Sequence, residues 1–247
     1  MKGAAYWSAL LYMAAFSSGW ADDKTITLTS LEWPPYTGQA LQNQGASAAV
    51  AKAAFEAMGY KLKIEFYPWS RAVGLVKTSK THMGYFPEYH STDNAKTFHY
   101  SDPIGKGPLG FAERADAPIS WSRLSDLASK KIGVVQDYVN TDEFDGMVAA
   151  KQLKVDVATD DSKNLLKLGG GRIDLAVVDQ NVMNYLLSND KDLKSLKGKL
   201  KFNGKLLEDK NLFICFKKGP EGEKLAKLFN DGLKKINVDQ IMGQHLK

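Results

Sequence analysis

Residues 83–114 read MGYFPEYHSTDNAKTFHYSDPIGKGPLGFAER, and this stretch decides the fold. An apolar run at 83–86 stops at Pro87, where a polar segment begins, and a second extended run follows at 109–112. A cluster of Pro and Gly falls within eight positions at the start of this second run: Pro103, Gly105, Gly107, Pro108 and Gly110. Proline fixes φ and glycine frees the backbone, so this stretch suits a connection between two bodies better than the interior of one.

The sequence on both sides of this stretch alternates between strand and helix patterns. Before it, strands are predicted at 26–31 and 61–66, with a helix that Gly59 ends. After Pro118 the pattern recurs, and a further extended run at 212–216 precedes two C-terminal helices. Strands that alternate with helices form parallel sheets with crossover helices. The sequence therefore predicts an α/β fold with two parallel-sheet lobes joined by two hinge crossings.

The domain organisation follows from these patterns. Residues 1–21 have the features of a signal peptide, because Lys2 precedes an apolar run of about 13 residues, short of the roughly 20 that span a membrane. We expect residues 22–105 and 210–247 to form lobe 1 and residues 106–209 to form lobe 2. The mature protein is then expected in the periplasm, with hinges at 104–108 and 207–211.

Composition excludes several classes of function. The chain has 247 residues, 44% hydrophobic, with a formal charge of +5 and a pI near 9.0, but its lysines are spread out and no Arg-rich block is interleaved with aromatics. We therefore expect no nucleic-acid partner. The one cysteine, Cys215, lies in an apolar strand and is expected to be a core residue, and the histidines lack metal-ligand spacing. We expect a monomer with no cofactor and no metal.

Candidate ligand-binding residues lie where predicted strands end, because ligands of parallel sheets collect beyond the carboxyl ends of the strands. Aromatic rings there offer flat apolar area and attract cations. The candidates are Glu32, Trp33, Tyr36, Trp69, Arg71, Pro87, Glu88, Tyr89, Asp137, Tyr138 and Asp179.

Three of these candidates have structural alternatives that the sequence leaves open. Trp33 can pack under Pro34 as a plug. Arg71 can bind an anion in fork geometry or pair with Glu32. Asp179 can bind a ligand or cap the helix that follows it.

A resemblance adds to this interpretation. The segment Ser91-x-x-Asn94-Ala95-Lys96, followed by Tyr100-Ser101-Asp102-Pro103, resembles the Thr-x-x-Arg-Ala-Lys…Phe-Ser-Asp-Pro signature of family 3 bacterial extracellular solute-binding proteins. These are periplasmic receptors of amino-acid-type ABC transporters. The aromatic-Pro-Tyr after the first strand and the run GRIDLAVVD at 171–179 are also similar.

The resemblance implies a type II periplasmic-binding-protein-like fold that binds a small molecule between its lobes and works with a membrane permease or sensor. It implies no reaction. In the family, the Asp at position 179 usually binds the ligand's amino group, and the Arg that holds the ligand carboxylate falls here on Asn94. We therefore add Asn94 to the candidates and expect an amine, a cationic amino-acid derivative or a small glycoside, unless Arg71 replaces the missing clamp.

Two alternative functions remain open at this point. Cyclohexadienyl dehydratases, which act on carboxylate substrates, resemble these binding proteins, although the absence of Arg at position 94 counts against such an enzyme. The third possibility is a ligand-presenting partner of a chemoreceptor or sensor kinase.

Overall fold

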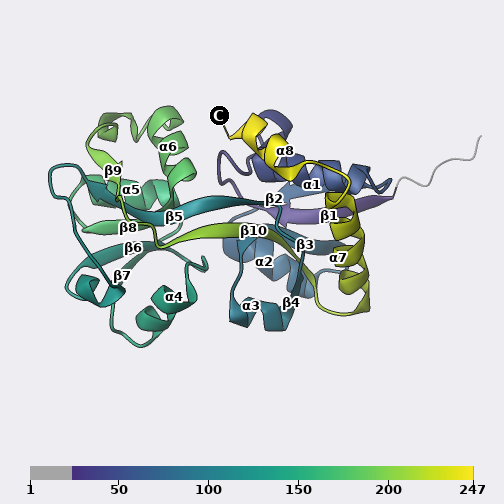
Figure 1. Cartoon of the computed structure of the whole chain (residues 1–247), viewed down its shortest axis with the longest axis horizontal. Coiled ribbons are helices and arrows are strands. Elements are labelled where there is room, and N and C mark those ends of the chain that lie inside the picture. The colour runs from purple at the N-terminus through teal and green to yellow at the C-terminus, as the bar shows by residue number, and fades with distance from the viewer. Residues whose placement is uncertain (1–23, 247) are drawn as a thin grey trace, which may run out of the picture.

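The computed structural model describes residues 24–246, so the signal peptide expected at 1–21 lies outside the described residues. The strands fall into two groups, which lie at the right and the left of Figure 1. The strand order is β2-β1-β3-β10-β5-β8-β6-β7, with β4 paired to β10 and β9 paired to β5. This arrangement confirms the predicted α/β fold with two lobes.

The first lobe is built around three parallel strands, in which β1 pairs with both β2 and β3. Its elements are β1 (Thr25–Ser30), η1 (Gln42–Gln44), α1 (Ala46–Glu56), β2 (Lys61–Phe66), α2 (Trp69–Thr78), β3 (His82–Tyr89), α3 (Thr92–Thr97), β4 (Phe98–Tyr100), α7 (Pro220–Leu233) and α8 (Val238–His245). In its core, the fully buried rings of Phe55, Phe216 and Phe229 contact one another, with centroids 5.0 to 6.5 Å apart.

The second lobe repeats the parallel arrangement, with β6 between β7 and β8. Its elements are η2 (Leu124–Leu127), β6 (Lys131–Val135), α4 (Asp142–Ala149), β7 (Lys154–Ala158), α5 (Asp161–Gly169), β8 (Leu175–Asp179), α6 (Gln180–Asn189), η3 (Lys194–Leu196) and β9 (Leu200–Phe202). Phe111 anchors its core, packing against Trp121 and Phe144 at centroid distances of 5.6 and 6.2 Å.

Two long strands, β5 (Gly105–Arg114) and β10 (Glu208–Lys217), run between the lobes (Figure 1). They pair antiparallel, from Gly105 opposite Leu212 to Leu109 opposite Glu208, and Lys106 forms an ion pair with Asp209 at 2.9 Å. The residues predicted as hinges lie on or directly beside this paired segment. The exact lobe boundaries stay a prediction.

The strand that was expected to stop at Pro87, within residues 83–114, is longer in the structure than predicted. The strand does not stop there, because β3 continues to Tyr89. Its ladder to β10 shifts register between Phe213 and Cys215, and the intervening Ile214 N–H donates instead to Ser101 Oγ at 2.9 Å. Pro87 has no N–H to donate to a neighbouring strand. Because β10 shifts register at this point, the pairing of β3 with β10 needs no hydrogen bond from Pro87.

The polar segment after β3 also contains more structure than expected. Ser91 caps the short helix α3 by accepting from the Asn94 N–H, and β4 then pairs with β10. Cys215 is fully buried on β10, as predicted. Between residues 24 and 246, no helix has the length and apolar character needed to cross a membrane.

Candidate functional site

A pocket lies between the two lobes, beyond the carboxyl ends of β1 and β3. It is lined by Leu31, Trp33, Trp69, Pro87, Glu88, Tyr89, Tyr138, Val139 and Leu212. Its volume is about 20 Å³, which is room for about one water molecule. The lobes are therefore closed on each other, and a solute of several atoms can enter only when they separate.

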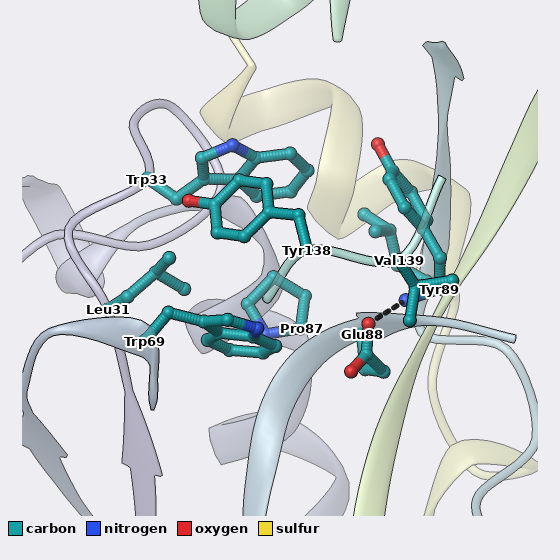
Figure 2. Close-up of a pocket in the computed structure, with 9 residues that line it drawn as sticks. Leu31, Trp33, Trp69, Pro87, Glu88, Tyr89, Tyr138 and Val139 are labelled. Carbon is teal, nitrogen blue, oxygen red and sulfur yellow. Dashed lines mark hydrogen bonds between the residues drawn. The ribbon is translucent and has the colours of Figure 1, made fainter. Parts of the chain in front are cut away.

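The walls of the pocket are aromatic. In Figure 2 the rings of Trp33, Trp69 and Tyr138 surround Pro87, with Glu88 at the side. Trp69 meets Tyr138, which belongs to the other lobe, edge to face at 5.9 Å. Because electron-rich ring faces attract cations and apolar groups alike, this arrangement suits an organic cation or a group with an apolar face.

Glu88 is the acidic residue of the wall, although only 4% of its surface is exposed. Its carboxylate accepts from the Tyr89 N–H at 2.9 Å, from Asn94 Nδ2 at 3.0 Å and from the Tyr85 hydroxyl at 3.2 Å. Burial raises the pKa of Glu88 to about 8, although the bonds from Tyr89 and Tyr85 and the charge of Lys210 act to lower it.

Lys210 was not among the candidates, and the structure places it at the edge of the site. Its side chain is nearly buried on β10, and Nζ lies 5.6 Å from the centre of the Tyr89 ring. Nζ also donates to the carbonyl of His90 at 3.5 Å and lies 3.4 Å from Glu208. The lysine therefore lies behind Tyr89 rather than in the pocket wall.

A second cluster, centred on Asp179, holds the lobes together beside the pocket. Asp179 ends β8, and its carboxylate accepts from the Tyr36 hydroxyl at 3.1 Å and from the Tyr89 hydroxyl at 3.4 Å, both of the first lobe. It also caps α6 through the N–H groups of Asn181 and Val182 at 2.8 and 3.2 Å. Asp179 thus caps the helix, which is one of the two alternatives that the sequence left open, and it also faces the other lobe, while its role in ligand binding stays a prediction.

A second buried carboxylate lies near Asp179. Asp161, at the start of α5, accepts from Trp33 Nε1 at 3.2 Å. Burial, and after it the neighbouring charge of Asp179, raises the pKa of Asp161 to about 7. Burial likewise raises the pKa of Asp179 to about 7. Two acidic side chains of the second lobe therefore face aromatic residues of the first, and both titrate near neutral pH.

Further contacts between the lobes lie at the rim of the pocket. Trp69 Nε1 donates to the carbonyl of Asp137 at 3.1 Å, and the Ser70 hydroxyl donates to the Asp137 carboxylate. Nearby, Thr92 donates to Asp142 at 3.1 Å. The predicted candidates Trp69, Asp137 and Tyr138 are thus brought together across the interface.

Two candidates lie apart from the pocket. Glu32 is exposed and accepts from the N–H of Gln39 at 3.0 Å. Arg71 is also exposed and lies over the ring of Tyr67 at 4.7 Å. The closed structure brings Arg71 neither to Glu32 nor to the pocket wall.

Trp33, for which the sequence left a packing role open, is buried, with 7% of its surface exposed. It stacks on Tyr36 with ring centroids 4.6 Å apart and faces the second lobe through its indole nitrogen. Asp161 was missed, although it follows a strand end in the run Asp160-Asp161-Ser162, where the rule that found Asp179 also applies. Lys210 had no comparable signal, since its burial depends on packing between the lobes.

The fold and the site together define a two-lobed binding protein with a pocket between its lobes. The chain belongs to the bacterial extracellular solute-binding proteins, family 3, whose model matches residues 26–246. The described residues contain no group of three or more His, Cys, Asp or Glu side chains that could hold a metal ion.

Solved structures share the fold at low sequence identity. A histidine kinase sensor domain with similarity to periplasmic binding proteins has a TM-score of 0.76 and 19% identity, over 90% of this chain and 96% of its own. An ancestral amino acid-binding protein, a precursor of cyclohexadienyl dehydratase, has a TM-score of 0.70 and 17% identity, over 91% and 96%. An amino acid ABC transporter substrate-binding protein from Streptococcus pneumoniae, bound to L-arginine, has a TM-score of 0.71 and 14% identity, over 90% and 93%. No curated protein matches the chain.

Proposed function

We propose that this protein is a periplasmic receptor that captures a small solute carrying a positively charged amine or guanidinium group and delivers it to an ABC permease. The observation that carries the proposal is the composition of the pocket wall. Its wall contains aromatic rings and one carboxylate, that of Glu88, and the residues that line it include no Lys or Arg. Family membership supports the binding of a solute, and the wall favours a cation over an anion.

The carboxylates of the second lobe supply a further attraction. Asp161 and Asp179 lie just beyond Trp33 and Tyr89, and each now bonds to a side chain of the first lobe. When the lobes separate, these carboxylates become free to meet an amine. A solute that contacts the aromatic wall of one lobe and the acids of the other favours the closed form, because its contacts with both lobes are complete only there.

The test is a thermal-shift comparison of matched pairs that differ only in the α-carboxylate, such as agmatine with arginine and cadaverine with lysine. A ligand at about 100 times its Kd stabilises by about 2.7 kcal/mol, or about 5 to 11 °C in a chain of this size. We expect the amines to raise the melting temperature more than the amino acids. Larger shifts with arginine and lysine, or no shift with any cation, would refute the proposal.

The partner is tested separately from the ligand. Deletion of the gene should abolish uptake of the radiolabelled amine if the partner is a permease. Normal uptake together with loss of an amine-dependent transcriptional response would instead indicate the sensor alternative.

A further inference from the structure

Asn94 occupies the position at which the family's signature has the arginine that holds the ligand carboxylate. In this structure its side-chain amide donates to Glu88 Oε2 at 3.0 Å. The group that Asn94 binds is therefore a carboxylate of the chain itself. Asn94, which stands where the family signature has an arginine, and Glu88 therefore belong to the same hydrogen-bonded pair.

The surroundings of Glu88 supply hydrogen-bond donors to both oxygens of its carboxyl group. Oε2 accepts from Asn94 and from the Tyr85 hydroxyl, and Oε1 accepts from the Tyr89 backbone N–H. An ionised carboxylate only accepts hydrogen bonds, so it matches donors on both oxygens. Among the described residues, no Lys or Arg forms an ion pair with Glu88, and hydrogen bonds alone hold it.

The site is also closed to a second anion. Glu88 is almost fully buried, and it lines the same pocket as the rings of Trp33, Trp69 and Tyr138, with Pro87 between it and these rings in Figure 2. A ligand carboxylate in the space of that pocket would meet the Glu88 carboxyl and no Lys or Arg in the wall, which disfavours an anion in a buried site. A cation in the same space would be attracted by Glu88.

We propose that Glu88 takes the place of the ligand carboxylate, so that the site accepts solutes with a cationic group and no carboxylate. This deepens the proposed function and rests on it only in treating the pocket as the solute site. The chain thus carries, in its own side chain, the carboxyl group that an amino acid would bring. Selectivity against amino acids then follows from an occupied site as well as from the loss of an arginine.

Chemical rescue tests this directly. Glu88→Ala removes four heavy atoms, Cγ, Cδ, Oε1 and Oε2, and acetate has the same four in the same arrangement. We expect acetate to raise the melting temperature of E88A saturably, by about 3 to 6 °C at about ten times its Kd. Chloride at equal ionic strength should not raise the melting temperature of E88A. Neutral acetamide should raise it less than acetate does, because its NH₂ group would face the hydrogen-bond donors that now face Glu88.

The controls separate filling of this site from general effects of salt. Wild type and Glu88→Gln keep the site filled, so acetate should not stabilise either one. In E88A/N94A one donor is missing, so rescue should need several-fold more acetate. If E88A does not stay folded at rest, the same comparison is made as its refolding yield with and without acetate. Equal responses of E88A and wild type to acetate would overturn the inference.

A second arm addresses ligand choice. In E88A/N94R the internal carboxylate is gone and an arginine is restored, so arginine should gain at least about tenfold in affinity relative to agmatine. Unchanged preference in this variant also counts against the inference. Failure of agmatine to bind wild type, together with successful acetate rescue of E88A, would refute the proposed amine ligand and leave the role of Glu88 standing.

Discussion

Replacement of Asp179 by asparagine should change how stability depends on pH. The carboxyl of Asp179 is 1% exposed, and its pKa is raised from an ordinary value near 3.8 to about 7. Between these two values the folded, closed protein binds a proton that the unfolded chain does not. The unliganded protein must therefore lose stability as the pH rises through this range.

The size of the effect follows from the pKa values. Over each pH unit in which only the folded state holds the proton, the free energy of unfolding falls by about 1.36 kcal/mol. The two units from pH 5 to 7 therefore lower it by about 2.7 kcal/mol for Asp179 alone. Asparagine is neutral throughout and still accepts from Tyr36 and from the Asn181 N–H. The free energy of unfolding of D179N, relative to wild type, should thus rise by about 2.7 kcal/mol between pH 5 and pH 8, or about 5 to 11 °C in melting temperature.

The assay is urea denaturation at pH 5, 6, 7 and 8, with protein freed of any bound solute by unfolding and refolding. Asp156→Asn is the matched control. The pKa of Asp156 is lowered, first through a hydrogen bond from Lys131, so its stabilisation is lost only below about pH 4. The free energy of unfolding of D156N should therefore change with pH in the same way as that of wild type between pH 5 and pH 8. If D179N also runs parallel to wild type, Asp179 is not protonated in the closed form and the reasoning fails.

Three further predictions concern the closed interface. Gly107→Ala places a methyl group against Asp179 and the Tyr36 hydroxyl, so it should separate that pair, and solution scattering should report a larger radius of gyration than wild type without ligand. Trp33→Phe removes the donor to Asp161 and should lower the urea-derived free energy of unfolding by about 1 to 3 kcal/mol at pH 6, with an unchanged value contradicting the bond. Agmatine should bind more tightly at pH 8 than at pH 6 by calorimetry, with proton release, because a cation favours ionised carboxylates; tighter binding at pH 6 would contradict this.

The fold could be predicted from the sequence because its signals are local. Alternation such as that at 61–66 and the Gly/Pro cluster at 103–110 each depend on a few neighbouring residues. Pro87 shows where local rules fail, since a proline that should end a strand is accommodated by a register shift in β10, a strand more than 120 positions away in sequence. The helix at Thr92–Thr97 was missed for a related reason, because its sequence TDNAKT, with Ala95 as its one apolar residue, carries no apolar periodicity.

The strand-end rule found part of the candidate site. It placed Trp33, Trp69, Tyr89, Tyr138 and Asp179 near one another, and the structure brings them to one interface. The rule does not say which way a side chain turns after its strand ends. Glu32 and Trp33 are adjacent in sequence, yet one points to solvent and the other to the second lobe.

The role of Asn94 illustrates why a missing residue is harder to interpret than one that is present. From sequence, the loss of an arginine at this position indicates a weaker hold on a carboxylate, and Arg71 is the natural replacement. The structure instead shows a carboxylate already bound, six positions earlier in the chain, with Arg71 turned away over Tyr67. Removing a positive charge beside an empty site would only lower affinity for an anion. We propose that Glu88 fills this site, so that a cationic solute beside it would favour the ionised form of a carboxyl whose pKa burial raises.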